Sequence, residues 1–282
     1  RDGHGLWHVD VDRGVLDGMD ADVPGRKKIN AYAWRFFAAC RALSAERRDT
    51  GGWLGKVSAW RDGLDPVGLH TSAVCSGVNP YLFVRELSHL APSNAIVVSE
   101  CGGNSVIFHQ AWVSKTGQRI FSSHGSSAMG QGLPLAIGAA IAQPERPVIA
   151  VIGDGGFTLS AAELNTVRIQ AARLKNLRVF VLNNRILGIT KRWQAINLAG
   201  RTFACGPNVE SGYEAPNVVK VCEAYGIAAM TFHDIGNAYH HLLPDGRDRY
   251  PRVWDIQYPG WDRYLPAVRG NTPVDQMITE EP

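Results

Sequence analysis

Pro147-Val148-Ile149-Ala150-Val151-Ile152-Gly153-Asp154-Gly155-Gly156 and Leu177-Arg178-Val179-Phe180-Val181-Leu182-Asn183-Asn184 are the two stretches that decide the fold of this chain. Each is a short run of apolar, largely β-branched residues that ends in small or amide side chains. Such runs are typical of strands buried on both faces of a parallel sheet. A helix is expected between them, over about residues 160–172, and this strand–helix–strand unit predicts two parallel, neighbouring strands.

The same alternation continues on both sides of this unit. Further apolar runs cover residues 95–99, 227–231 and 252–256, and helices are expected over 81–90, 130–142, 216–225 and 235–243. Strands that alternate with helices indicate an α/β fold, with a parallel sheet covered by helices on both faces. The sequence predicts this fold for residues 79–282.

The first part of the chain has a different pattern. Residues 5–12 alternate between apolar and polar, as a half-buried strand does, and a helix is expected over 29–43. Asp10 and Asp12 share one strand face, and no third carboxylate follows at useful spacing, so an ordinary strand is favoured over a metal site. We expect residues 1–44 to be the C-terminal end of a second α/β domain and residues 45–78, punctuated by glycine and proline, to be a connector.

Composition excludes several classes of protein. The 282 residues are 45% hydrophobic and 20% charged, which is typical of a globular chain and not of a disordered or fibrous one. The net charge of +3 comes from interspersed residues, so no nucleic-acid partner is expected, and no apolar run approaches the ~20 residues of a membrane span. The five cysteines are odd in number and lack C-x-x-C spacing, which argues against a disulfide framework and a zinc site and predicts a cytoplasmic protein.

Asp154 and Asn184 carry the strongest chemical signal. Each follows one of the two central strands, so both are expected at the carboxyl edge of the sheet. Neighbouring strands lie ~4.8 Å apart and magnesium takes oxygen ligands at ~2.1 Å, so the two side chains can share one cation. The glycines around Asp154 leave backbone N–H groups bare for an anion. Together they predict a diphosphate held by magnesium, although Asp-Gly and Asn-Asn also occur in ordinary turns.

These residues resemble a known motif. Gly153-Asp154-Gly155, followed after 27 residues by Asn183-Asn184, is similar to the thiamine-diphosphate motif. Residues 125–140, 183–194 and 266–277 resemble the corresponding segments of acetohydroxyacid (acetolactate) synthases, and residues 1–44 resemble the end of their middle domain. The chain is thus identified as similar to the C-terminal half of a thiamine-diphosphate-dependent carboligase.

The resemblance implies a role for particular residues. Asp154, Asn184 and the main-chain carbonyl of Ile186 would bind Mg²⁺, and Trp193 would line a substrate pocket, unless it is only a packed aromatic residue. His124 is a candidate for proton relay, against the alternative of a loop histidine with no chemical role. Met129 would hold the cofactor bent, against the alternative of a core residue that fills a gap. The cofactor contacts implied by the resemblance are Asn104, Ser127, Met129, Gly153, Gly155, Gly156 and Ile189.

The resemblance also implies an activity that needs a second polypeptide. The family decarboxylates a small 2-oxoacid, with pyruvate as the expected donor, and couples the product to an acceptor. Its activating glutamate belongs to a pyrimidine-binding domain, usually of another subunit, and neither Glu100 nor Glu163 is assigned that role. We therefore expect a homo- or hetero-oligomer. Three origins of this chain are open: a naturally split enzyme, a longer chain that has been cleaved, or a longer chain that has been shortened. The alternatives are a simple 2-oxoacid decarboxylase or oxidase, and a non-catalytic interaction subunit.

Overall fold

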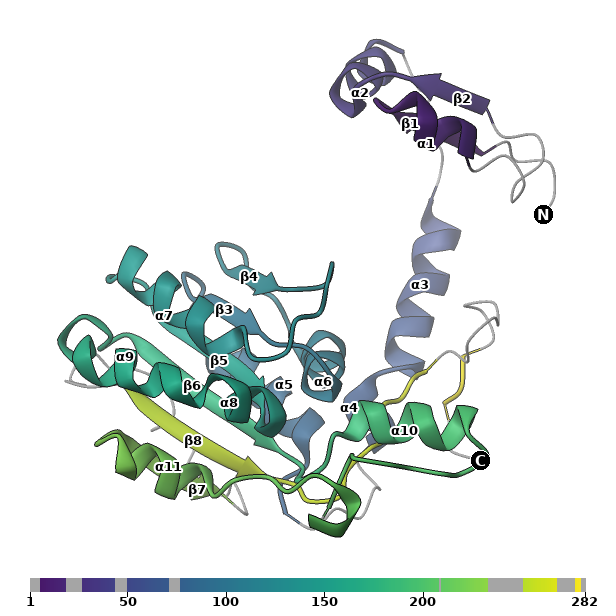
Figure 1. Ribbon diagram of the computed structural model, residues 1–282. Helices are drawn as coiled ribbons and strands as arrows, with labels where there is room; N and C mark the ends of the chain where they lie inside the picture. The colour runs from purple at the N-terminus through teal and green to yellow at the C-terminus, as the bar shows by residue number, and fades with distance from the viewer. Residues whose placement is uncertain are drawn as a thin grey trace. The chain divides into compact units, whose positions relative to one another are not determined.

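The computed structural model describes residues 6–18, 27–43, 50–70, 77–207, 209–232, 251–267 and 277–279 (Figure 1). The chain divides into two compact units, Arg1–Ala59 and Trp60–Pro282. This division falls inside the stretch predicted as a connector, which contains the helices α3 (Gly51–Gly63) and α4 (Pro66–His70). The domain limits expected from the sequence remain a prediction.

The first unit contains a pair of parallel strands, β1 (Trp7–Asp10) and β2 (Lys27–Asn30). The helix α1 (Arg13–Gly18) follows β1, and α2 (Ala33–Ala42) follows β2. The helix predicted over 29–43 therefore begins later than expected. Its first residues belong to β2, because Ile29 pairs with Val9 in the parallel ladder. Asn30 also donates from Nδ2 to the carbonyl of Asp10 at 3.1 Å, which ties the end of β2 to β1.

The second unit is built on a parallel sheet with the strand order β4-β3-β5-β6-β8-β7. The central pair predicted from the sequence is confirmed, since β5 and β6 are parallel neighbours with Gly153 opposite Leu182. All the pairings in this sheet are parallel, as the predicted fold class requires. The strands are β3 (Ile96–Ser99), β4 (Arg119–Ser122), β5 (Val148–Gly153), β6 (Leu177–Asn183), β7 (Ala228–Phe232) and β8 (Arg252–Gln257).

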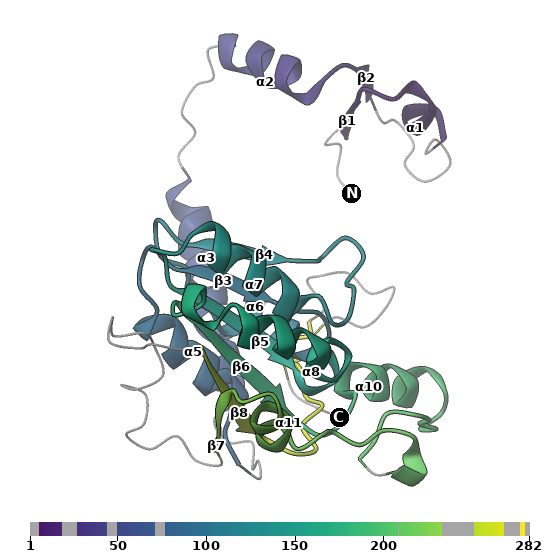
Figure 2. The same ribbon diagram turned by 60° about the vertical axis from the view of Figure 1, so that its left-hand side comes forward.

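Helices cover both faces of this sheet, and each face has its own hydrophobic core. One core contains side chains of α5 (Pro80–Leu90) and α6 (Gly103–Ala111). The other contains side chains of α7 (Gly132–Ala142), α8 (Asp154–Ser160), α9 (Leu164–Ile169) and α11 (Val218–Ala224). Figure 2 shows α7 and α8 in front of the sheet. Every residue of β6 is buried, which explains its unbroken apolar run.

Local signals explain where several helices begin. Asn79 caps α5, because its Oδ1 accepts from the backbone N–H groups of Tyr81 at 3.0 Å and Leu82 at 3.1 Å. Pro80 occupies the first helical position, where its missing N–H has no consequence. Asn217 caps α11 in the same way by accepting from the backbone N–H of Lys220 at 2.9 Å.

Some elements differ from those expected. The helix predicted over 160–172 is shortened to α9, with short 3₁₀ turns on both sides, and the helix predicted over 235–243 lies outside the described residues. The sequence analysis did not find β4, α6, α8 or α10 (Gly188–Asn197). Three of these helices begin in glycine-rich turns, which have poor helix propensity. No helix in the described ranges is both long and apolar enough to cross a membrane.

Candidate active site

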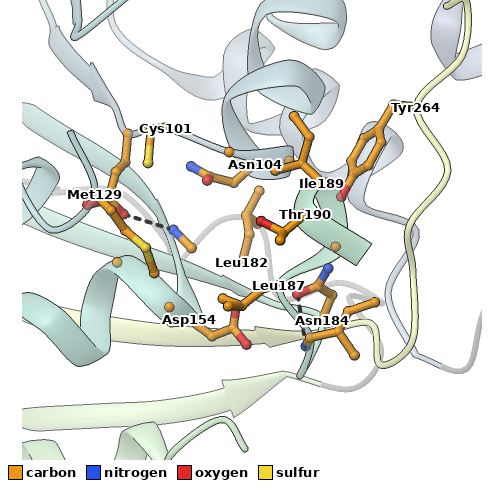
Figure 3. Close-up of a pocket in the computed structure, with 18 of the residues that line it drawn as sticks. Cys101, Asn104, Met129, Asp154, Leu182, Asn184, Leu187, Ile189, Thr190 and Tyr264 are labelled. Atoms are coloured by element: carbon orange, nitrogen blue, oxygen red, sulfur yellow. Dashed lines mark hydrogen bonds between the residues drawn. The ribbon is translucent and has the colours of Figure 1, made fainter. Parts of the chain in front are cut away.

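A pocket of about 380 Å³ lies where β5 and β6 end (Figure 3). Asp154 directly follows β5 and begins α8, whereas Asn184 directly follows β6. Their strands are neighbours, so both residues reach the same pocket, as expected from the crossover. All ten residues that the sequence analysis associated with metal or cofactor line this pocket: Asn104, Ser127, Met129, Gly153, Asp154, Gly155, Gly156, Asn184, Ile186 and Ile189.

Asp154 is a buried carboxylate without a cationic partner. Its side chain is 3% exposed, and it accepts a hydrogen bond from the Tyr213 hydroxyl at 3.1 Å. Among the described residues no lysine, arginine or histidine forms an ion pair with it. Burial raises the pKa of Asp154 to about 7, and the Tyr213 hydrogen bond opposes this shift only in part. A cation beside Asp154 supplies the charge that this environment lacks, so the residue fits a metal ligand.

The two asparagines after β6 serve different purposes. Asn184 donates from Nδ2 to the carbonyl of Trp261 at 2.8 Å, which commits its nitrogen and leaves Oδ1 as the available ligand atom. That oxygen accepts only a long hydrogen bond, at 3.4 Å, from the backbone N–H of Ile186. Asn183 instead donates to Asp255 of β8 at 2.9 Å. Asn184 therefore belongs to the pocket, and Asn183 fixes the end of β6 to its neighbouring strand.

The donors gathered here suit magnesium more than zinc. One carboxylate, one amide oxygen and the nearby Ile186 backbone are hard oxygen donors. The described residues contain no group of three or more histidine, cysteine, aspartate or glutamate side chains that could hold a metal. The described residues therefore contain no cage of three carboxylate or thiolate side chains, and the mixed donor set implied by the resemblance remains a prediction.

The glycines that follow Asp154 are closely packed, and the hydrogen-bonded Glu100 carboxylate leaves no room for a side chain at Gly156. A Cβ atom on Gly155 would lie 2.5 Å from Met129 Cε and 2.9 Å from Leu187 Cδ2, and one on Gly156 would overlap the Glu100 carboxylate. The absence of side chains leaves the backbone of this turn accessible from the pocket. Across the pocket, α6 begins at Gly103 without a side-chain cap, so its first N–H groups are a further anion site.

Met129 is not a core residue in this chain. Its side chain is 42% exposed, and its Cε lies close to Gly155. Figure 3 shows Met129 at the wall of the pocket. The alternative of a buried gap-filler is therefore wrong for the chain as described. A support for a bound ring system remains the prediction for this residue.

Glu100 connects two segments of the pocket wall by hydrogen bonds, a role that the sequence did not reveal. It is 1% exposed, and its Oε1 accepts from the backbone N–H of Gly130 at 2.7 Å and of Gly132 at 3.3 Å. Its Oε2 accepts from the N–H of Gly153 at 3.3 Å. Burial raises the pKa of Glu100, and these backbone hydrogen bonds oppose the shift. The carboxylate thus joins the loop that carries Met129 to the turn that carries Asp154.

Glu100→Gln is expected to destabilise the fold by about 1–3 kcal/mol, because both carboxylate oxygens are used as acceptors and an amide must turn its NH₂ toward a backbone N–H. Urea unfolding of the variant measures this loss. Glu145→Gln is the control, since Glu145 is exposed, and it should leave the unfolding midpoint unchanged. Equal midpoints for wild type and Glu100→Gln would show that the three hydrogen bonds contribute nothing.

The remaining predicted residues lie outside this pocket. His124 lines an adjoining hollow, and Trp193 lies on α10 with 59% of its side chain exposed. Next to Trp193 on α10, Lys191 and Arg192 both contact Asp262. Lys191 Nζ pairs with its carboxylate at 3.1 Å, and Arg192 donates to its carbonyl at 3.3 Å. These two cations therefore hold the segment after β8 rather than facing the pocket.

Several pocket residues had no signal in the sequence. Tyr258 and Tyr264 line the pocket from the segment after β8, and Tyr213 reaches Asp154 from a loop 59 residues further along the chain. No local pattern marks a tyrosine for such a contact, since the contact exists only once distant segments pack together.

Comparison with known proteins agrees with this geometry. The chain is 29% identical over 235 residues to acetolactate synthase 1, chloroplastic, of Nicotiana tabacum, which covers 79% of this chain and 34% of that protein. It is 27% identical over 272 residues to the acetolactate synthase large subunit of Lactococcus lactis subsp. lactis (strain IL1403), which covers 96% of this chain and 44% of that protein. The chain thus spans less than half the length of these relatives.

A solved structure shares the fold. The Rhodococcus jostii RHA1 thiamine diphosphate-dependent 4-hydroxybenzoylformate decarboxylase superposes with a TM-score of 0.64 at 20% identity, over 93% of this chain and 45% of that one. Residues 100–247, which are 148 of the 282 residues, match the family described as "Thiamine pyrophosphate enzyme, C-terminal TPP binding domain". This chain belongs to the thiamine pyrophosphate enzymes and carries their acetolactate synthase-like C-terminal, cofactor-binding domain.

Proposed function

We propose that this chain is the Mg²⁺- and thiamine diphosphate-binding part of a 2-oxoacid decarboxylase or carboligase similar to acetolactate synthase. One observation carries the proposal. The buried Asp154 carboxylate has no cationic partner among the described residues, and it lies in one pocket with the Asn184 amide and a turn of bare glycines. A divalent cation and a diphosphate bound here would satisfy all three features, with Asp154 and Asn184 holding the cation and the glycine N–H groups holding the anion.

Each group in the pocket has a task in this proposal. Asp154, the Asn184 amide oxygen and the Ile186 carbonyl hold the metal. Backbone N–H groups of Gly155 and Gly156 bind the diphosphate, with Asn104 and the start of α6 across the pocket. Met129 supports the ring end of the cofactor, and the Ser127 carbonyl accepts a hydrogen bond from it. The bound cofactor supplies the carbanion chemistry that breaks the bond between the carbonyl and carboxyl carbons of a 2-oxoacid, and the protein supplies binding and orientation.

The donor, the partner and the location are further proposals. Pyruvate is proposed as the donor because the relatives with the highest similarity reported above are acetolactate synthases. A second polypeptide is proposed to provide the pyrimidine-binding domain and its activating glutamate, because the chain spans only 34% and 44% of those relatives. The assembly is then a homo- or hetero-oligomer. The odd number of cysteines and their lack of C-x-x-C spacing support a cytoplasmic location.

Calorimetry with thiamine diphosphate tests the proposal directly. Binding is expected in the presence of Mg²⁺ and is expected to be lost when EDTA removes the metal. The intact mass of the native preparation should reveal a second polypeptide, or a longer chain, that supplies the missing domain. Incubation of that assembly with pyruvate should release CO₂ and form a coupled product. Free aldehyde in place of a coupled product would favour a simple decarboxylase, and no cofactor binding would favour a non-catalytic interaction subunit.

A further inference from the structure

A second hollow, of about 330 Å³, adjoins the cofactor pocket within the unit Trp60–Pro282. The two hollows share part of their walls: Glu100, Cys101, Gly102, Ser127 and Ile189. Beyond this shared wall, the second hollow is lined by α6 and by the segment that follows β4. A molecule held in the second hollow therefore lies next to a cofactor held in the first.

Unused polar groups gather in this second hollow. The rings of His109 and His124 lie 4.5 Å apart between centroids, and neither imidazole has a hydrogen-bond partner among the described residues. Both side chains are reachable from solvent. The Ser123 hydroxyl oxygen is buried and also has no partner in the described part of the chain. Three polar side chains that line one hollow are thus available to a ligand.

Three other polar side chains of the hollow, those of Gln110, Ser105 and Glu100, are already used by the fold. Gln110 accepts from the Tyr81 hydroxyl at 2.7 Å and donates to the carbonyl of Pro266 at 2.8 Å. Ser105 accepts from Ser99, and Glu100 accepts from backbone N–H groups beneath the cofactor pocket. Ser122, Ser127 and Cys101 also line the hollow, but its imidazoles are those of His109 and His124, and the Ser123 hydroxyl is the buried lining group without a partner among the described residues.

The charge of the hollow narrows the class of ligand. Within the described ranges no lysine or arginine lines it. Partial desolvation, together with the neighbouring His124, lowers the pKa of His109. The imidazoles can donate hydrogen bonds to an oxygen-rich group without placing a permanent cation beside it. A carboxylate that must depart as neutral CO₂ is best held in this way, because a fixed cation stabilises the ground-state carboxylate more than the transition state and slows its loss.

We propose that the second hollow binds the carboxylate of the 2-oxoacid substrate, through hydrogen bonds from His109, His124 and Ser123. This inference rests on the proposed function, since it assigns a place to the group that the decarboxylation removes. It gives His124 a binding role that it shares with His109, in place of the lone proton relay considered from the sequence.

The test uses the assembled protein with Mg²⁺ and thiamine diphosphate, and two small probes. Oxamate is an unreactive 2-oxoacid analogue, and oxamide has the same shape without the carboxylate. We expect oxamate, but not oxamide, to move the NMR signals of both imidazoles in isotope-labelled protein. In calorimetry His109→Ala and His124→Ala should each weaken oxamate binding by about tenfold or more, the loss of a hydrogen bond to a charged group. Cofactor affinity should change by less than about twofold, which also shows that the variants are folded.

His89→Ala is the matched control, since His89 is exposed on α5 and lines neither hollow, and it should leave oxamate binding unchanged. Oxamate that binds without moving either imidazole signal, or with the same affinity in both variants, overturns the inference. So does an equal response to oxamide. Loss of cofactor binding in the histidine variants would assign the hollow to the cofactor instead. Failure of wild type to bind the cofactor overturns the proposed function and is measured separately.

Discussion

Asp154→Ala is expected to weaken Mg²⁺-dependent binding of thiamine diphosphate by a factor on the order of 100 or more. Changes beside a metal ligand already cost 10–100-fold in metal affinity, so removal of the charged ligand itself should cost at least as much. The substitution is expected to have a different effect on the stability of the metal-free protein. The variant removes a buried, uncompensated carboxylate, so the metal-free protein should be as stable as wild type or more so. Calorimetry measures the first effect, and thermal unfolding with and without Mg²⁺ and cofactor measures the second.

Asp262→Ala is a suitable control for this experiment. It removes a carboxylate from the same unit, but one that is paired with Lys191 and does not line the pocket. Ligand present at about 100 times its dissociation constant stabilises a protein by about 2.7 kcal/mol, so the control should keep this gain and Asp154→Ala should lose it. If Asp154→Ala retained the gain from Mg²⁺ and cofactor, the magnesium site proposed here would be wrong.

Gly156→Ala is expected to destabilise the fold by about 3 kcal/mol. The added methyl group would overlap the Glu100 carboxylate, whose position is held by hydrogen bonds on both oxygens. Overpacking of a tight site typically costs 1–3 kcal/mol, and here it also displaces a charged acceptor from its backbone donors. Urea unfolding followed by circular dichroism measures the loss. Cofactor affinity should fall as well, because Asp154 belongs to the same turn and is displaced when the new methyl group pushes Gly156 away from Glu100.

Gly138→Ala provides a control with the opposite sign. Gly138 lies inside α7, and a Cβ atom there meets nothing within 4 Å. Alanine in a helix interior is favoured over glycine by about 0.5–1 kcal/mol, so this variant should be slightly more stable than wild type. Similar unfolding midpoints for the two variants would contradict the close approach of Glu100 to Gly156.

The site was predictable from the sequence only where local pattern and topology sufficed. The apolar runs that form β5 and β6 determined that Asp154 and Asn184 meet, since parallel neighbours joined by one crossover end at the same edge. The glycines around Asp154 predicted a bare backbone for the same local reason. The role of Glu100 was not predictable, because a carboxylate after β3 looks the same whether it faces solvent or three backbone N–H groups.

The sequence by itself determined five of the six strands of the sheet, all except β4, together with their parallel direction and the pair of residues proposed as metal ligands. These features depend on residue spacing along a short piece of chain. Tertiary structure decided which partners those ligands have. Tyr213 reaches Asp154 and Trp261 orients Asn184 only because segments far apart in the sequence pack against the same end of the sheet. His109 lies beside His124 because α6 packs next to the segment that follows β4. Contacts of this kind depend on packing in three dimensions, for which no local pattern of residues exists.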